Sequence, residues 1–255
     1  SLNPLAVDLG QDDRKIDPDA GWPQLFGPTH DSISHEDHVL TNWPADGPPV
    51  HWDINIGTGY SAPVVWGKRL ILLQRVGDEE IVQCLAAETG NELWKFAYPT
   101  SYECTFGYSS GPYSTPIISG SHVYTLGAQG QFHCLELETG NLIWSRNLSQ
   151  EYQVPQDLFG MGHTPLLEDD RLILNIGGTV DNSGIGALDA QTGKTLWTAT
   201  DHSAAYATPR AATIHGRRYV FMLTGYGLVS LDPGTGKVHW SIKNHANHEN
   251  TVSAT

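Results

Sequence analysis

The side chains of this 255-residue chain that best suit ligand chemistry recur at one position of a repeated tetrapeptide. It reads Tyr-Ser-Ala-Pro at 60–63, Tyr-Ser-Thr-Pro at 113–116, Gly-His-Thr-Pro at 162–165 and Tyr-Ala-Thr-Pro at 206–209. Tyr60, Tyr113 and Tyr206 predict phenol rings gathered at one place, which suits a planar or sugar-like ligand; the competing interpretation is that they pack a rim and bond to backbone. His163 and Arg210 are the better polar candidates, because they depart from the residue types of the other copies.

Residue types that bind metal ions are also present, but their patterns are weak. Residues 177–184 are acidic and rich in oxygen-bearing side chains, which suits calcium, yet they lack a full ligand set and favour a plain hairpin loop. The histidine pairs at 35/38 and 245/248 lie on no recognisable helix and have no cysteine partners. Cys84 and Cys134 occupy one repeat position, as expected of small buried thiols. With Cys104 the chain has three cysteines, which is not the even number that a disulfide framework needs. The sequence predicts no metal site.

A second repeated phrase indicates the elements that must hold these residues. At four places Thr-Gly is followed by a tryptophan four residues after the glycine. A leucine four residues before each threonine closes a short apolar strand. The phrase therefore predicts a hairpin whose glycine takes positive φ and whose second strand carries the tryptophan. The four tryptophans, which lie 50, 53 and 43 residues apart, are Trp94, Trp144, Trp197 and Trp240.

Each repeat holds four strands. After each tetrapeptide come an apolar run, a turn and a second run, such as residues 70–73 or 123–126, and then the hairpin. Four short antiparallel strands at a period of about 40 to 50 residues are typical of a propeller blade. No long stretch has helical spacing of apolar residues. The predicted fold is an all-β propeller of four-stranded antiparallel blades.

The residue types resemble the PQQ-like β-propeller repeat family. In that family the stretch before the last strand reads approximately Ala-Leu-Asp-Ala-x-Thr-Gly-Lys-x-x-Trp, and residues 187–197 match it almost letter for letter. The resemblance covers about residues 50–255. It implies that Trp94, Trp144, Trp197 and Trp240 dock between neighbouring blades, near the turn of the next one, in a structural role.

The resemblance leaves two functions open. PQQ-dependent alcohol dehydrogenases of the family carry adjacent cysteines over the quinone, a calcium ion and a catalytic aspartate. This chain has no adjacent cysteine pair. The leading interpretation is therefore an exported, non-catalytic binding or scaffold propeller with no cofactor, similar to the outer-membrane assembly lipoprotein of this repeat type. The alternative is a quinoprotein alcohol or sugar dehydrogenase with PQQ and calcium.

The number of repeats predicts an incomplete ring. The chain has about four full repeats, the opening of a fifth at 253–255, and an isolated strand around Trp52. Trp52 precedes Trp94 by 42 residues, where the last strand of a preceding blade would lie. Family members close rings of seven or eight blades, so the remaining blades are expected from the same, longer polypeptide or from a second copy.

Composition limits the partners and the domain organisation. Lys and Arg number 14 against 28 Asp and Glu, a net charge of −14, which disfavours nucleic acid and anionic membrane surfaces. No run of about 18 apolar residues is present to span a bilayer. We expect a flexible acidic arm at 1–20, a lead-in at 21–49 that packs on the propeller, and blades at 50–255. The predicted partner is a protein or small ligand at the loop-rich face, and the resemblance implies a periplasmic location.

Overall fold

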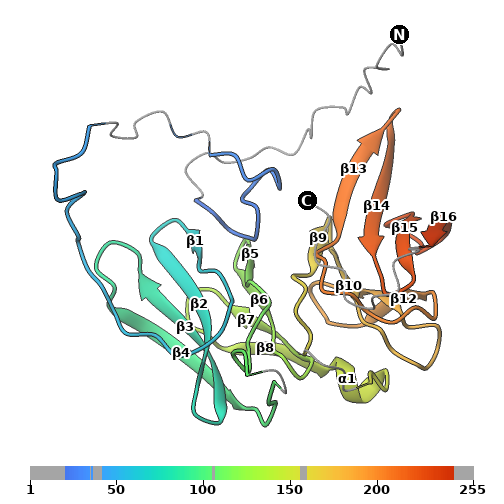
Figure 1. Ribbon diagram of the computed structural model, residues 1–255, viewed down its shortest axis with the longest axis horizontal. Coiled ribbons are helices and arrows are strands. Elements are labelled where there is room, and N and C mark those ends of the chain that lie inside the picture. Colours follow the sequence, from blue (N-terminus) through green and yellow to red (C-terminus); the bar gives the residue numbers. More distant parts are fainter. Residues whose placement is uncertain (1–20, 35, 37–41, 105–106, 156–159, 244–255) are drawn as a thin grey trace.

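The computed structural model describes residues 21–34, 36, 42–104, 107–155 and 160–243, which hold four separate four-stranded antiparallel sheets (Figure 1). Blade 1 comprises β1 (Val64–Trp66), β2 (Arg69–Val76), β3 (Glu79–Ala86) and β4 (Glu92–Pro99). Blade 2 comprises β5 (Ile117–Ser119), β6 (His122–Leu126), β7 (Gln131–Glu136) and β8 (Leu142–Asn147). Blade 3 comprises β9 (Leu166–Glu168), β10 (Arg171–Asn175), β11 (Ile185–Asp189) and β12 (Thr195–Ala199). Blade 4 comprises β13 (Arg210–Ile214), β14 (Arg217–Leu223), β15 (Gly227–Leu231) and β16 (Val238–Lys243).

The prediction of an all-β propeller of four-stranded blades is confirmed. Within the described residues the single helix is α1 (Leu148–Glu151), one turn at the end of β8. The Asn147 side chain caps it by accepting the Gln150 N–H at 3.1 Å. Each sheet keeps its strands in chain order, so within a blade each strand pairs with its neighbour in the sequence.

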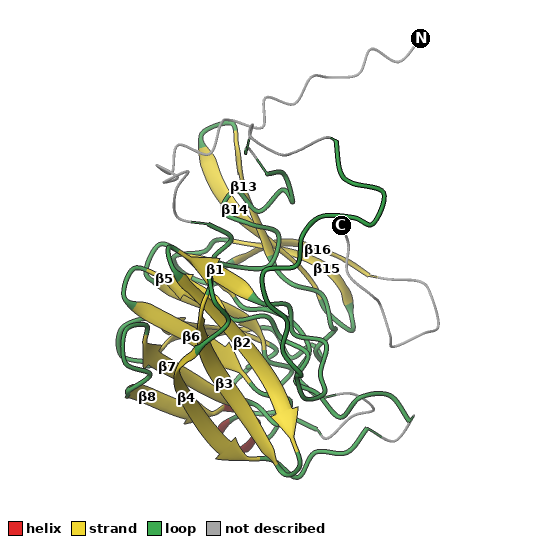
Figure 2. Ribbon diagram, turned by 90° about the vertical axis from the view of Figure 1, so that its left-hand side faces the viewer, coloured by secondary structure: helices red, strands yellow, loops and turns green. Residues whose placement is uncertain are grey.

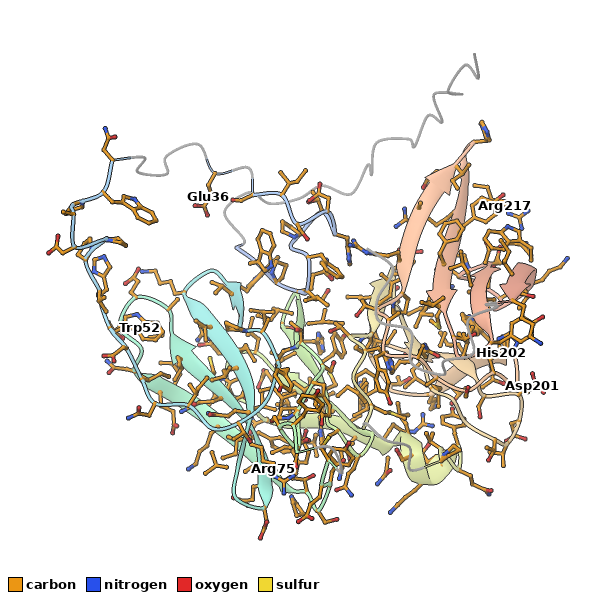
Figure 3. The ribbon with its side chains drawn as sticks, viewed as in Figure 1. Glu36, Trp52, Arg75, Asp201, His202 and Arg217 are labelled. Carbon is orange, nitrogen blue, oxygen red and sulfur yellow. The ribbon has the colours of Figure 1, made fainter. Side chains whose placement is uncertain are left out.

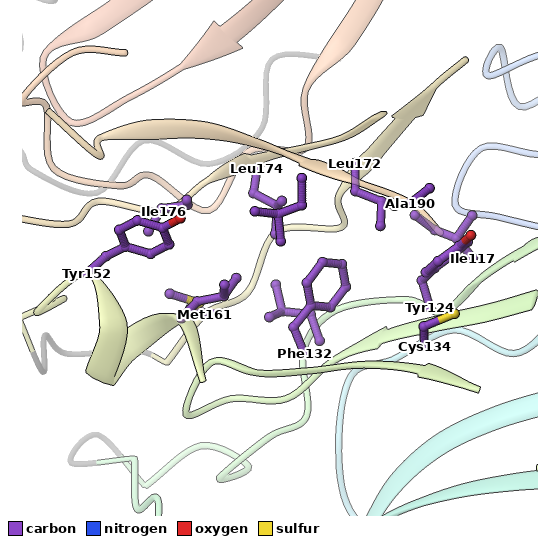
Figure 4. Packing of buried hydrophobic residues seen from close by; sticks show 13 residues of the cluster. Ile117, Tyr124, Phe132, Cys134, Tyr152, Met161, Leu172, Leu174, Ile176 and Ala190 are labelled. Atoms are coloured by element: carbon purple, nitrogen blue, oxygen red, sulfur yellow. The ribbon is translucent and has the colours of Figure 1, made fainter. Parts of the chain in front are cut away.

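The hydrophobic core lies between blades. One cluster joins blades 2 and 3, with Phe132 on β7 facing Leu172 and Leu174 on β10 (Figure 4). Two further clusters join blades 1 and 2, and blades 3 and 4. In blade 2 the second and third strands, β6 and β7, are buried on both faces for this reason, whereas the fourth strand, β8, carries exposed side chains on the outside.

The tryptophans form a repeated contact between consecutive blades. The Trp94 indole N–H donates to the Leu137 carbonyl at 3.0 Å, and its ring lies against Gly140 in the Thr-Gly turn of blade 2. Trp144 and Trp197 repeat both contacts on the turns of blades 3 and 4. Each of these glycines has φ near +70°, and an added Cβ would meet indole atoms at 2.8 Å or less. The turn glycine therefore supplies both the backbone conformation and the space for the ring.

The repeated tetrapeptide makes a second contact between blades. The Ala62 N–H donates to the Thr115 hydroxyl at 3.3 Å, and the Thr115 N–H to the Thr164 hydroxyl at 3.0 Å. The Thr164 N–H in turn donates to the Thr208 hydroxyl at 3.1 Å. Each threonine thus satisfies a backbone donor of the preceding blade. The corresponding residue of the fifth copy, Thr255, lies outside the described residues.

The described part of the lead-in packs on the inner strands. The Trp22 carbonyl accepts the Val65 N–H of β1 at 2.9 Å, and the Pro23 carbonyl accepts the Ile118 N–H of β5 at 2.8 Å. The segment continues from there toward β13 (Figure 1). The predicted acidic arm at 1–20 lies outside the described residues.

Candidate functional site

The alternation of strand directions gathers the longer connections at one end of the blades. In each blade the turn between the first and second strands and the Thr-Gly turn lie at one end. The turn between the second and third strands lies at the other end, together with the connections between blades (Figure 2). We call this second end the loop-rich face. It includes the described parts of the connections at 100–116, 152–165 and 200–209. Long ordered loops of this kind often carry binding sites.

Two of the predicted tyrosines stack on one another. The rings of Tyr60 and Tyr113 lie 6.0 Å apart, nearly parallel at 14°, and Tyr60 is 62% exposed. Tyr102 meets Tyr113 edge-on. The Tyr113 hydroxyl donates to the Ser109 carbonyl at 2.6 Å, and burial raises its pKa. Tyr113 is thus held in place, while Tyr60 presents a ring face to solvent.

Tyr206 and His163 line one small cavity. It measures about 50 Å³, room for a few water molecules, and Tyr206 packs beside Gly162. His163 is buried, and its Nε2 accepts the Asn175 N–H at 3.2 Å, so the proton resides on Nδ1. Burial lowers the pKa of His163 to about 4, which keeps it neutral at pH 7.

Asn175 adds an unused acceptor beside this histidine. Its Nδ2 donates to the Ala205 carbonyl at 3.0 Å and to the Leu223 carbonyl at 2.8 Å. Its buried Oδ1 has no partner among the described residues. Both residues line the cavity, whose polar groups therefore include the neutral imidazole of His163 and the side-chain amide of Asn175.

Arg210 is directed elsewhere. Its guanidinium lies 3.9 Å above the Phe26 ring of the lead-in, a cation–π contact. Burial lowers the pKa of Arg210, and the charge of Asp31 opposes that shift. The structure therefore brings Tyr60, Tyr113, Tyr206 and His163 to one region, whereas Arg210 contacts the lead-in. A ligand role for any of these residues stays a prediction.

A larger polar groove crosses the loop-rich face between blades 1 and 2. Its volume is about 720 Å³, and Gln129 organises one wall by accepting from the Thr100 hydroxyl and the Ser101 N–H at 3.1 and 2.9 Å. Arg75 holds the neighbouring loop through the carbonyls of Tyr102 and Ser110 (Figure 3). Hydroxyl, amide and charged side chains dominate the lining: Arg75, Asp78, Thr100, Ser101, Glu103, Gln129, Gln131, Asn147, Ser149 and Gln150.

The described residues contain no group of three or more histidine, cysteine, aspartate or glutamate side chains arranged to hold a metal ion. The described part of the chain also has no helix long and apolar enough to cross a membrane. Cys84 and Cys134 are buried free thiols, and burial raises the pKa of Cys84 to about 11 and of Cys134 to about 12. Both therefore stay protonated at neutral pH. Residues 177–184 form a compact hairpin loop, closed by the Gly177 N–H and the Gly184 carbonyl.

Sequence reasoning missed Asn175 and the groove. Asn175 ends an apolar strand, and the one signal available was a polar residue where blade 2 has Leu126. The groove combines side chains from two blades that are 26 to 75 positions apart in the sequence, such as Arg75 and Gln150. No local pattern marks such a set.

Comparison with known proteins decides the family. The sequence profile described as outer membrane protein assembly factor BamB matches residues 78–254. The chain belongs to the BamB family. The predicted relation to PQQ-like repeat propellers is thereby confirmed. No curated protein matches the chain.

Solved structures similar to this BamB-family chain include a BamB protein, a dehydrogenase and a WD40 domain. BamB from Moraxella catarrhalis is 20% identical, with a TM-score of 0.39 over 69% of this chain and 58% of that one. The quinohemoprotein alcohol dehydrogenase ADHIIG from Pseudomonas putida HK5 is 16% identical, with a TM-score of 0.49 over 71% and 34%. The Pan2 WD40 domain from Neurospora crassa is 14% identical, with a TM-score of 0.43 over 69% and 46%. The chain thus spans less than two thirds of each of these structures.

Proposed function

We propose that this chain is a non-catalytic scaffold propeller that binds a protein partner through its loop-rich face during outer-membrane protein assembly. The observation that carries the proposal is the BamB family match over residues 78–254. This proposal implies that the protein is exported and works in the periplasm. The mechanism is binding alone: the blades hold the loops rigid, and the loops present donors and acceptors to a partner.

The polar groove between blades 1 and 2 is the proposed contact surface. Its amide and hydroxyl side chains match the backbone groups of a partner loop or strand. Glu103 and Asp78 add exposed carboxylates in a chain of net charge −14. A partner with basic side chains at this contact is therefore favoured.

A pair of charge variants tests the surface. Glu103→Arg with Gln150→Arg places two cations in the groove, and Glu88→Arg with Gln191→Arg places two on exposed Thr-Gly turns at the opposite end. In cells of the source organism that lack the gene, the intact protein and the turn variant are expected to restore outer-membrane protein levels. The groove variant is expected to fail while folding normally by circular dichroism. Equal restoration by both variants would contradict the assignment of the groove.

The quinoprotein alternative has its own test. A scaffold gives no heat when the complete protein is titrated with PQQ and Ca²⁺, and it does not reduce an artificial acceptor with an alcohol. Tight binding that His163→Ala and Arg210→Ala abolish would replace the scaffold proposal with a cofactor site.

A further inference from the structure

The turn between β6 and β7, residues 127–130, connects the two walls of the polar groove. On the blade 1 side, the Gln129 amide oxygen accepts the Ser101 N–H at 2.9 Å. On the blade 2 side, the Gly130 carbonyl accepts the Leu148 N–H at 2.9 Å, which fixes the start of α1. Residues of α1 form part of the groove lining. The position of this one turn therefore sets the position of both walls.

A buried carboxyl of blade 1 holds the turn. Glu80 on β3 is fully buried, and its Oε1 accepts the Ala128 N–H at 3.0 Å. The Ala128 carbonyl accepts the Met161 N–H at 2.9 Å, so the backbone of Ala128 is held at both of its polar groups. The Glu80 Oε2 and the Tyr98 hydroxyl lie so close to Gly127 that an added Cβ would collide with both. Glu80 thus contacts two consecutive residues of the turn.

Packing alone does not explain a carboxyl at this position. Burying a carboxyl costs free energy unless protein groups replace its hydrogen bonds to water, and burial raises the pKa of Glu80. Glu80 lies four positions before the residue that pairs with the blade 1 tryptophan. The other blades have Gly130, Ser183 and Tyr226 at that place, none of them acidic. A costly side chain in one copy alone indicates a role beyond stability.

We propose that Glu80 is the positioning residue of the polar groove. It does not belong to the groove lining, but it fixes Ala128, and the next residue, Gln129, holds the blade 1 wall through Ser101. Both the ionised and the protonated carboxyl keep an acceptor for the Ala128 N–H. The partner-binding role of the groove rests on the proposed function, whereas the positioning role is a property of this chain that can be measured without a partner.

Hydrogen exchange of individual amides, measured by NMR on the full chain, tests the positioning role. Glu80→Met removes the acceptor at nearly constant size, and Glu80→Gln retains it. We expect Glu80→Met to speed exchange of the Ala128 and Ser101 amides about tenfold, and Glu80→Gln to leave both near the native rate. Gln129→Met should speed exchange at Ser101 alone, because Ala128 keeps its bond to Glu80. The amide of fully buried Leu172 on β10 is the reference for global unfolding.

A second variant reaches the same comparison without changing the carboxyl. Gly127→Ala displaces Glu80 by steric contact and should speed exchange at Ser101 as Glu80→Met does. Native exchange at Ser101 in both variants would overturn the positioning role. Equal acceleration by Glu80→Met and Glu80→Gln would also overturn it, and so would acceleration of Leu172 by the same factor as Ser101, because Glu80 would then stabilise the whole fold and not the groove.

The effect on binding has a separate readout. With a photoreactive amino acid at position 150 in the groove, we expect the crosslink to the partner to be lost in Glu80→Met and kept in Glu80→Gln. A native protein that captures no partner from position 150 would overturn the proposed function of the groove. Unchanged exchange at Ser101 would overturn only the role of Glu80.

Discussion

The indole of Trp197 on blade 3 lies directly against Gly236 on blade 4 and donates its N–H to the Pro233 carbonyl at 3.1 Å. One side chain thus joins the last strand of one blade to the turn of the next. The same pair of contacts recurs at blades 1, 2 and 3, with Gly90, Gly140 and Gly193 in place of Gly236. The repeated phrase in the sequence therefore encodes the joint between blades as well as the hairpin within each blade.

Truncating a docked tryptophan should lower the free energy of unfolding much more than truncating an exposed one. Trp197→Ala is expected to lower the free energy of unfolding by about 3 kcal/mol, the usual cost of emptying an aromatic site. Trp240→Ala serves as the matched control, because Trp240 is 41% exposed and the described residues offer it no turn. Urea unfolding followed by circular dichroism measures both. A loss below about 0.5 kcal/mol for Trp197→Ala would show that the indole contributes no docking energy.

The turn glycine can be tested separately from the tryptophan. Gly236 and Gly216 both have positive φ, at 71° and 75°, but an added Cβ meets the Trp197 ring at 2.4 Å at the first and open space at the second. Gly216→Ala should cost about 1 kcal/mol from backbone strain alone. Gly236→Ala should cost a further 1 to 3 kcal/mol, roughly, because the indole must move. Equal losses would mean that the ring has room to shift.

The threonine contacts predict a hydroxyl requirement. Thr164→Val keeps the shape of the side chain but removes the acceptor for the buried Thr115 N–H, so we expect a loss of about 1 to 3 kcal/mol. Thr164→Ser keeps the hydroxyl and should cost clearly less. Thermal unfolding of the two variants gives the comparison. A serine variant as unstable as the valine variant would show that the lost methyl group, and not the hydrogen bond, matters.

Sequence patterns predict the blades here because their signals are local. Gly193 and Trp197 are four residues apart, and the strand period and turn chemistry are visible within one repeat. The hydrogen bonds between copies of the tetrapeptide are harder to predict, because Thr115 and Thr164 are 49 positions apart. The repetition of the tetrapeptide is the only indication of a contact. The pairing of Arg210 with Phe26 spans most of the chain, and neither residue type indicates the other. The candidate site residues lie mainly at such long-range contacts. The sequence therefore identifies the residues but not the side chains and backbone groups that surround them.

A buried carboxyl gives a pH-dependent prediction. Glu80 is fully buried between blades 1 and 2, where it accepts the Ala128 N–H at 3.0 Å, and burial raises its pKa from 4.5. The folded protein therefore favours the protonated form, and stability falls as the pH rises above 4.5 through the folded pKa. Glu80→Gln mimics the protonated carboxyl and should raise the unfolding midpoint at pH 7. The gain should vanish below pH 4.5.

Exposed Glu79 provides the control for this change, because Glu79→Gln removes a neighbouring charge without altering a buried group. Urea unfolding at pH 4 and pH 7 distinguishes the two variants. A Glu80→Gln protein that is less stable than the native protein at both pH values would contradict a neutral Glu80 in the folded state.

If the loop-rich face binds a protein partner, site-specific photo-crosslinking in intact cells should capture that partner. A photoreactive amino acid replaces Gln150 in the groove or Gln191 on the opposite Thr-Gly turn. We expect a crosslinked product at position 150 whose second component belongs to the outer-membrane assembly machinery, and no such product at position 191. Crosslinking to that machinery from position 191 alone, or from neither position, would contradict it.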